Sequence, residues 1–448
     1  MQFSKRVNAI RLSATLFAIL ITATSAIFAL SNEQVIHRFK GSHTDGYRPF
    51  ASLVADARGH LYGTTFQGGD GPALCWQRLG FGCGTVFEMI PPTSSGGSWS
   101  EVLLHSFQGG ADGGAPLYGL TLDETGNLYG TTDSTIFQLS PPGNPEGAWT
   151  ETTLYTFGSD ALAPTGNLSF DKAGNLYGTT YLPPGGAVYQ LSPPSTPGGS
   201  WTFTILYNFA GQSDGAEPEG GVILDSTGAL YGTTSSGGRT ESCDVGYGCG
   251  TVFKLVPPAE QEGAWTEYTL YAFGSLPNDG RYPTDSLVFD ATGNLYGATS
   301  DGGSNNCGDG YQCGTVFELS PPSDGKGFWT ETILYNFAGG SDGSFPQANL
   351  TFDAHGKALY SVTADGGLAG GHCPVWPVFG CGTVFRLLPP ATEGGAWTKQ
   401  IVHRFGTGEP QDGIAPVAGL IRFGNAFYGT TEYGGGAASG TVFTFTAP

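Results

Sequence analysis

Eight cysteines lie along the chain in four close pairs, and their spacing limits the chemistry they can take part in. Each pair brackets a loop between a phrase related to LYGTT and a phrase related to GTVF; the pairs are Cys75 and Cys83, Cys243 and Cys249, Cys307 and Cys313, and Cys373 and Cys381. Where that loop is short, at TTDSTIF and TTYLPPGGAVY, both cysteines are absent together. Zinc sites favour closer cysteines and histidine partners, so we predict four local disulfides, each contributing roughly 2–3 kcal/mol.

The loops that these disulfides would close carry aromatic residues, which are the first candidates for ligand contacts. One aromatic residue stands two positions before each second cysteine: Phe81, Tyr247, Tyr311 and Phe379. The two longer loops add Trp76 and Trp376. Rigid aromatic side chains suit stacking against sugar rings or contact with another protein. The alternative is that each aromatic side chain packs beneath its own loop as a small local core.

A second recurring feature is an aspartate followed four residues later by a proline. It occurs seven times, at Asp45, Asp112, Asp160, Asp214, Asp279, Asp342 and Asp412. In a circular repeat fold these carboxylates would gather around the mouth of the central channel, where they would attract a calcium ion or a polyhydroxylated ligand. The alternative is a turn role, in which each aspartate accepts hydrogen bonds from nearby backbone N–H groups. No other metal or cofactor is indicated.

Patterns that would identify a catalytic site are weak. GQSDG and GGSDG match a nucleophile-elbow pattern only formally, because they fall in glycine-rich loops and not between a strand and a helix. The seven histidines are scattered without metal-ligand spacing. Carboxylates for glycosidase-like acid and base roles are plentiful, but the sequence does not show which two would face each other. No catalytic residue is identified.

The N-terminal segment and the charge of the chain indicate export. Lys5, Arg6 and Arg11 precede an apolar run that ends in small residues, which is typical of a secretory signal peptide over residues 1–29; a retained membrane anchor is the alternative. Removing this segment changes the formal net charge from −20 to −23, which disfavours nucleic acid and anionic membranes as partners. We expect a secreted protein, extracellular or periplasmic, whose mature chain has no membrane span and is a monomer.

Four short phrases recur along the mature chain and predict its architecture. LTLD-like, LYGTT-like and GTVF-like phrases have seven copies each, whereas the WTETTLYTF-like phrase has six. Each phrase alternates apolar and polar residues between turn signals, as strands do, and four strands per repeat are typical of a propeller blade. QVIHRF at residues 34–39 resembles QIVHRF at 400–405, so the N-terminal strand would supply the missing copy. We predict one all-β domain over residues 30–448, a seven-bladed β-propeller; an open solenoid is the alternative.

The phrases GTVFxLxPP, GxWTExxLYxF and DxxGNLYGTT resemble the GloVer tandem-repeat family of exported bacterial proteins over nearly the whole mature chain. DETGNLYGTT at residues 123–132 is also similar to the strand-turn-strand of NHL-type propellers. The resemblance implies export and propeller-like repeats, and it implies no reaction.

Three functions are consistent with these features. The first is a secreted binding module for carbohydrate or a protein partner, favoured because the clearest difference between repeats is the aromatic content of the cysteine loops. The second is a secreted polysaccharide-acting hydrolase or lyase on the same scaffold. The third is a structural or surface-layer protein.

Overall fold

The computed structural model describes residues 33–447 except 43, 73–74, 76–79, 81, 95, 145–146, 159–162, 182–184, 197, 240–242, 244–246, 261–262, 309, 324–326, 368–372, 374–379, 393 and 407–411. The predicted signal peptide therefore lies outside the described residues. Within them, no helix is long and apolar enough to cross a membrane.

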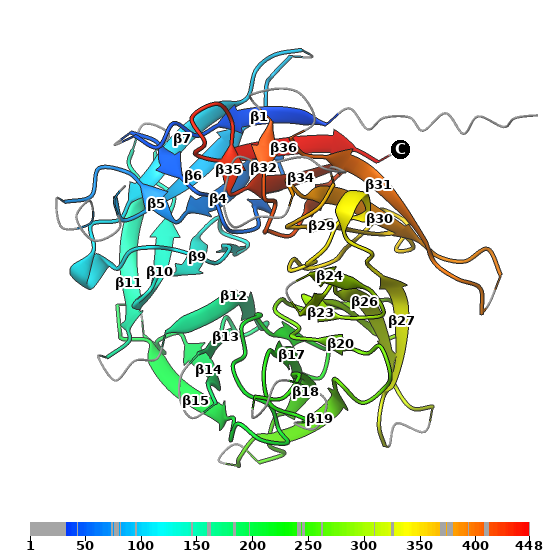
Figure 1. Ribbon diagram of the computed structural model, residues 1–448. Coiled ribbons are helices and arrows are strands. Elements are labelled where there is room, and N and C mark those ends of the chain that lie inside the picture. The colour runs from blue at the N-terminus through cyan, green and yellow to red at the C-terminus, as the bar shows by residue number, and fades with distance from the viewer. Residues whose placement is uncertain are drawn as a thin grey trace, which may run out of the picture.

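Seven four-stranded antiparallel sheets form a ring, which confirms the predicted seven-bladed propeller (Figure 1). The innermost strands are β3 (Val54–Ala55), β8 (Thr121–Leu122), β12 (Pro164–Phe170), β16 (Ile223–Leu224), β21 (Val288–Phe289), β28 (Thr351–Phe352) and β33 (Ile421–Phe423). The second strands are β4 (Leu61–Thr65), β9 (Leu128–Thr131), β13 (Leu176–Thr180), β17 (Leu230–Thr234), β22 (Leu295–Thr299), β29 (Leu359–Thr363) and β34 (Ala426–Thr431).

The outer half of each blade consists of two longer strands. The third strands are β6 (Thr85–Ile90), β10 (Thr135–Ser140), β14 (Ala187–Ser192), β18 (Thr251–Val256), β26 (Thr315–Ser320), β30 (Thr383–Leu388) and β36 (Thr441–Thr446). The outermost strands are β7 (Ser100–Ser106), β11 (Thr150–Thr156), β15 (Thr202–Asn208), β19 (Thr266–Ala272), β27 (Thr330–Asn336), β31 (Thr398–Arg404) and β1 (Gln34–Arg38).

Short elements decorate the loops of one face. They are the strand pairs β2 (Gly46–Tyr47) with β5 (Gln67–Gly68), β20 (Gly280–Arg281) with β23 (Asp301–Gly302), β24 (Asn306–Gly308) with β25 (Tyr311–Gln312), and β32 (Gly413–Ile414) with β35 (Tyr433–Gly434), and the 3-10 turns η1 (Gly110–Asp112) and η2 (Gly340–Asp342).

The hydrophobic core lies between neighbouring blades. The strand β4 is buried along its whole length. The outer strand β7 has no fully buried residue and alternates between exposed and partly buried residues over its first four positions, because only one of its faces packs against protein. Within a blade, Gly63 allows the Phe87 ring to pack directly on the backbone, since a Cβ at Gly63 would lie 2.6 Å from that ring. The repeated glycine of LYGTT is therefore a packing requirement.

The N-terminal strand closes the ring as predicted. β1 pairs with β36, with Val35 opposite Phe443 and His37 opposite Val442, so the first and last strands of the chain share one blade (Figure 1). Phe39 follows β1 and is fully buried, with its ring edge-on to Phe87 of the next blade. Closure therefore gives the edge of β36 a partner strand and covers the face of the first blade that carries Phe87.

Replacing Phe39 by alanine tests this closure. We expect the free energy of unfolding to fall by about 3–5 kcal/mol, because the substitution leaves a cavity between the last blade and the first. Chemical denaturation of the purified protein measures the change. Phe423→Ala, at a ring that is 37% exposed, is the control and should cost less than about 1 kcal/mol. Equal losses for the two variants would contradict the closure role.

Candidate functional site

The channel is formed by the segment that leads from the outer strand of one blade to the inner strand of the next. In six blades the residue before the proline has a φ between 51° and 59°, a left-handed conformation that is uncommon for residues other than glycine; these residues are Arg48, Ala115, Glu217, Tyr282, Phe345 and Ala415. The chain turns sharply there, and the residues just after the proline face the channel.

The disulfides lie next to this turn. All four predicted pairs are bonded, with Cα separations of 5.1–5.5 Å. The carbonyl of each second cysteine accepts a hydrogen bond from the left-handed residue of the next blade: Cys83 from Ala115 at 2.7 Å, Cys249 from Tyr282 at 2.9 Å, Cys313 from Phe345 at 3.1 Å and Cys381 from Ala415 at 3.0 Å. The cysteine loops therefore hold the backbone that shapes the channel mouth.

A cavity of about 480 Å³ occupies the channel and is lined by residues from all seven blades. Its lining changes from blade to blade, because the residues after the proline are the part of the repeat that does not recur. For example, PFAS, PLYG, PEGG and PTDS occupy this position in the first, second, fourth and fifth blades. A pocket with a few convergent polar groups is the usual form of a small-ligand site.

Three carboxyl groups line the cavity, those of Glu219, Asp285 and Glu432, and the first two have raised pKa values, as does the phenol of Tyr118. Asp285 accepts hydrogen bonds from the N–H groups of Ser286 and Asn349, both at 2.6 Å, yet burial raises its pKa to about 6. Burial also raises the pKa of Glu219, which accepts a hydrogen bond from Ser235 at 3.3 Å. Burial, and then the charges of Glu219 and Asp285, raise the pKa of Tyr118 to about 12. Both of these carboxylates can accept hydrogen bonds, and the protonated fraction of Asp285, whose pKa is about 6, can also donate one.

Amide side chains complete the polar lining. Asn167 accepts a hydrogen bond from the Gly119 N–H at 2.6 Å and lies 3.4 Å from the Ser52 hydroxyl, so it connects three blades. The side-chain oxygen of Asn349 is buried and has no hydrogen-bond partner among the described residues. This oxygen lies against Gly419 and is not part of the cavity lining, so it is not a candidate ligand acceptor.

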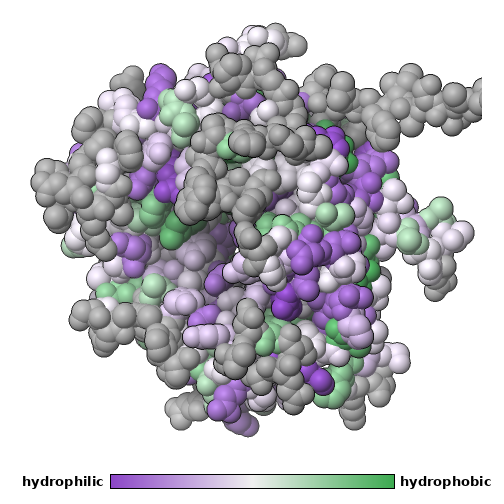
Figure 2. All heavy atoms as spheres, in the orientation of Figure 1, coloured by the Kyte–Doolittle hydropathy of each residue, from purple (hydrophilic) through white to green (hydrophobic). Residues whose placement is uncertain are grey.

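An aromatic group lies at one side of the mouth. The Arg48 guanidinium forms an ion pair with Glu432 and lies 4.8 Å from the centre of the Phe50 ring, 5.1 Å from that of Tyr433 and 5.7 Å from that of Phe66. Figure 2, which views the molecule along the direction of Figure 1, shows hydrophobic and hydrophilic residues interspersed. The mouth thus offers rings next to polar groups, the combination that sugar surfaces require.

The aromatic candidates of the cysteine loops are described in part. Tyr247 and Tyr311 are 68% and 53% exposed, so neither packs beneath its loop. Trp76, Phe81, Trp376 and Phe379 lie outside the described residues. The two tyrosines lie on the same face as the channel mouth, because both loops join a second strand to a third.

The aspartates that precede proline lie between the outer parts of neighbouring blades, and the described ones do not line the channel cavity. Asp160 is outside the described residues. The others accept a hydrogen bond from the backbone just after the outer strand: Asp45 from Lys40, Asp112 from Gln108, Asp214 from Ala210, Asp279 from Ser275, Asp342 from Ala338 and Asp412 from Gly406, at 2.6–3.0 Å. These contacts are those of the turn role.

Each of these aspartates also meets side chains of two outer strands. A tyrosine or histidine of the preceding blade contacts it, as Tyr271 does by donating a hydrogen bond to Asp279 at 2.9 Å. A residue of the next outer strand approaches from the other side, and here it is Glu331, to which the Tyr271 hydroxyl also donates at 3.3 Å. Burial and the charge of Asp279 raise the pKa of Glu331, and burial likewise raises that of Asp279. Burial raises the pKa of the equivalent Glu267 to about 7.

A second concave surface lies on the opposite face, between the fourth and fifth blades. It is a groove of about 1080 Å³, lined by Tyr268, Phe328 and Trp329 among others. Phe328 is 85% and Tyr268 53% exposed. The residues at the position of Phe328 in the other repeats are serine or alanine, so this aromatic surface belongs to one repeat.

Known proteins resemble this chain in repeat sequence and in fold. Residues 133–373 match the Gloeobacter/Verrucomicrobia repeat. The extracellular domain of the hybrid two-component system BT3049 of B. thetaiotaomicron superposes with a TM-score of 0.50 at 12% identity, over 93% of this chain and 41% of that one. The PQQ domain of pyranose dehydrogenase from Coprinopsis cinerea has a TM-score of 0.44 at 11% identity, covering 93% and 95% of the two chains. No curated protein matches in sequence. At these identities the structural likenesses concern the fold alone.

Sequence reasoning did not single out the residues that line the channel and its rim, among them Tyr118, Glu219, Asp285, Asn167 and Arg48. The sequence did contain a signal for the residues of the channel lining. When the seven repeats are aligned on the proline, the next three residues differ between repeats, whereas the flanking phrases recur.

The buried glutamates predict that stability depends on pH. In the folded protein the pKa values of Glu267 and Glu331 lie above the ordinary value of 4.5. Their contribution to the free energy of unfolding is therefore fully present below pH 4.5 and is lost as the pH rises toward 7 and beyond. We expect the melting temperature at pH 5.5 to exceed that at pH 8 by at least about 3 °C. Glu267→Gln with Glu331→Gln should flatten the difference, and the exposed Glu124→Gln should not. A melting temperature that rises between pH 5.5 and pH 8 would contradict this account.

Proposed function

Because the chain belongs to the Gloeobacter/Verrucomicrobia repeat family and its repeats close into a seven-bladed propeller, we propose that it is a secreted binding module for carbohydrate, which binds at the channel mouth. The observation that carries the proposal is the lining of the channel cavity, where the blades present different polar side chains around one pocket. A structural ring needs no such variation, whereas recognition of an asymmetric ligand does.

The chemistry of the lining favours a neutral sugar. Sugar hydroxyls both donate and accept hydrogen bonds, and the partly protonated Asp285 carboxyl, the Tyr118 hydroxyl and the Asn167 amide offer both functions. Phosphorylated or sulfated ligands would meet Glu219, Asp285 and the net charge of −20, which repel anions. Residues Arg48, Phe50 and Phe66 supply flat surfaces at the rim.

The cysteine loops would extend this site outward. Tyr247 and Tyr311 are exposed on the same face and are suited to stack against further sugar units of a polymer. We propose the same role for Trp76, Phe81, Trp376 and Phe379. The disulfides would keep these rings in place at low entropic cost.

A hydrolase or lyase is the second candidate function. Two carboxyl groups with raised pKa values, Asp285 and Glu219, line one cavity, and acid and base catalysis in glycosidases uses such pairs. In that case Asp285, with a pKa of about 6, would be the candidate acid. A protein partner would instead favour the exposed aromatic groove that contains Phe328.

The test is incubation with a panel of neutral and anionic polysaccharides, with affinity electrophoresis to measure retention and a reducing-end assay to measure cleavage. We expect retention by a neutral polysaccharide without new reducing ends. Glu219→Gln and Tyr118→Phe should each weaken binding about tenfold, since each removes or alters one hydrogen-bonding group.

Control variants locate the site. Phe328→Ala and Tyr268→Ala, in the groove on the opposite face, should leave retention unchanged. Loss of retention in these variants but not in the channel variants would place the site in the groove and contradict the channel. New reducing ends that disappear in Asp285→Asn would replace binding by hydrolysis. Retention of none of the polysaccharides would refute the carbohydrate proposal.

The exposed tyrosines give a separate prediction. Tyr247→Ala combined with Tyr311→Ala should weaken retention by a long polysaccharide at least threefold and leave binding of a short oligosaccharide unchanged, because the short ligand would occupy only the channel mouth. Titration calorimetry with both ligand lengths measures this. An equal loss for the two lengths would mean that the tyrosines act on the channel itself.

A further inference from the structure

Two groups of one histidine and two carboxylates lie on either side of the blade that closes the ring. The first is Glu33, His403 and Asp412; the second is His37, Asp45 and Glu101. In each group one side-chain atom from every residue lies within 4.8 Å of the others. We propose that these two groups are binding sites for divalent transition-metal ions, such as Zn²⁺ or Mn²⁺, and that the bound ions fasten the N-terminal strand to its neighbours.

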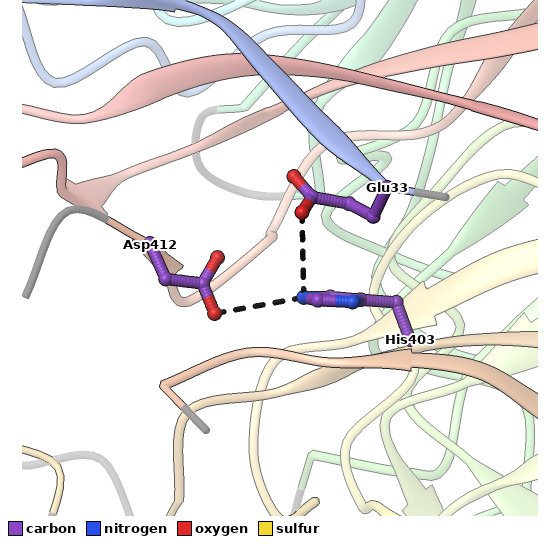
Figure 3. Close-up of side chains that lie close together, drawn as sticks. All are labelled: Glu33, His403 and Asp412. Carbon is purple, nitrogen blue, oxygen red and sulfur yellow. Dashed lines mark ion pairs between the residues drawn. The ribbon is translucent and has the colours of Figure 1, made fainter. Parts of the chain in front are cut away.

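The spacing of the polar atoms fits a metal ion better than direct hydrogen bonds. The Nε2 atom of His403 lies 3.5 Å from Asp412 Oδ2 and 3.9 Å from Glu33 Oε2 (Figure 3). Both distances exceed those of an ordinary hydrogen bond. Ligands about 2.0–2.2 Å from a common tetrahedral ion would lie about 3.4 Å apart. In the second group, His37 Nε2 lies 3.6 Å from Asp45 Oδ1, so its geometry is similar.

Unpaired buried atoms provide an independent observation. Glu33 Oε1 and His403 Nε2 in the first group, and His37 Nε2 and Glu101 Oε1 in the second, are buried without a hydrogen-bond partner among the described residues. The side chain of Glu33 is only 10% exposed. Leaving such atoms unpaired is costly, and an ion among them would remove that cost.

The other blade interfaces show what a cation does at this position. Lys399 occupies the place of Glu33 when TKQIVHRF is aligned with NEQVIHRF. Its side chain is 3% exposed, and its Nζ lies 2.9 Å from Asp342 Oδ1, the aspartate equivalent to Asp412. The repeat therefore accommodates a positive charge beside this aspartate. With glutamate in place of lysine, this ammonium group is absent, and Arg38 near Glu33 and Lys40 near Glu101 are not among the atoms of the two groups. A bound divalent ion would supply the positive charge between the carboxylates.

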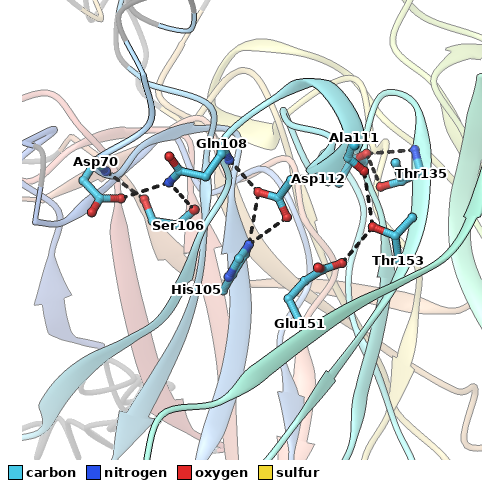
Figure 4. A network of polar contacts seen from close by, with 10 residues as sticks. Asp70, His105, Ser106, Gln108, Ala111, Asp112, Thr135, Glu151 and Thr153 are labelled. Carbon is cyan, nitrogen blue, oxygen red and sulfur yellow. Dashed lines mark hydrogen bonds and ion pairs between the residues drawn. The ribbon is translucent and has the colours of Figure 1, made fainter.

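A third histidine interface is arranged differently and serves as an internal control. His105 Nε2 lies 3.1 Å from Asp112 Oδ1, within hydrogen-bonding distance, and Glu151 accepts a hydrogen bond from Thr153 at 3.1 Å (Figure 4). Every member of this group already has a partner. We expect no metal ion there.

The donor set selects the class of ion. A neutral imidazole with two carboxylates suits zinc, manganese or iron, whereas calcium prefers a shell of oxygen ligands alone. Two carboxylates carry a charge of −2, which one divalent ion balances. The rings of His37 and His403 are also held edge-on against Phe39 and Phe405, so the Nε2 atoms are oriented before binding.

The position of the sites predicts their effect. Glu33 and His37 both belong to the N-terminal segment, the first just before β1 and the second within it. Glu33 meets His403 of β31 in the preceding blade, whereas His37 meets Glu101 of β7 in the following one. Ions at the two sites would therefore hold the closing strand from both sides, and stability would rise with the concentration of free metal ion.

The test uses protein produced without a polyhistidine tag, freed of metal ions by chelation and dialysed at pH 7.5. Titration calorimetry with Zn²⁺, and separately with Mn²⁺, should show two ions bound per chain for at least one of the metals. The melting temperature should rise by several degrees at saturation. Glu33→Gln and Glu101→Gln should each remove one site or weaken it at least tenfold, and His105→Gln should leave both intact.

Each contrary result refutes the proposal. Wild-type protein that binds neither metal ion saturably would do so, as would the same stoichiometry in the double variant Glu33→Gln with Glu101→Gln. Binding of Ca²⁺ alone would overturn the class of ion. If Glu33→Gln or Glu101→Gln does not fold without metal, the more conservative Glu33→Asp or Glu101→Asp replaces it. The number of ions bound by the wild-type protein tests the proposal in either case.

Discussion

The pairing of β1 with β36 is the constraint on which the rest of the structure depends. It turns an open row of repeats into a ring, and only a ring has a channel. The strand contributes more than backbone hydrogen bonds, since Phe39 fills the core between the last and first blades and His37 and Glu33 reach carboxylates on both sides. Loss of this strand would expose the edge of β36 and would also open the channel cavity, because the ring would no longer be closed.

The repeat and the channel obey different physical demands. Residues such as Phe87 and Gly63 recur because each blade must pack on the next in the same way, and a change in one blade would leave a void or a clash. The residues after each proline line the channel and lie outside the repeated packing between blades, so they can differ from blade to blade. Asp285 and Tyr118 occupy such positions. Function can therefore change there without disturbing the scaffold.

The sequence predicted the parts of the molecule that rest on periodic packing. The strands, the blade number, the closing role of residues 34–39 and the four disulfides all follow from recurring phrases and paired losses of cysteine. It could not locate the channel-facing side chains, because in six blades their direction depends on the left-handed residue before the proline. Alanine and phenylalanine, as at Ala115 and Phe345, are not residue types that indicate this conformation. The location of Asp279 is a similar case, since its turn contacts were foreseen but its neighbour Glu331 lies 52 positions along the chain, on the next outer strand.

The aspartates at the blade interfaces show how one buried charge can be compensated in several ways. Lys399 supplies an ammonium group to Asp342, and His105 forms a direct contact with Asp112. Between the second and third blades, Tyr155 of β11 stacks on Phe203 of β15 at 4.3 Å, so an aromatic ring takes the position that a carboxylate has in other blades. Glu331 and Asp279 have raised pKa values instead and share a hydroxyl donor. A scaffold with seven copies of one interface can vary the charge at each copy, because the other six keep the ring closed. The two interfaces that flank β1 differ from the rest, since a change of charge there would affect the closure of the ring.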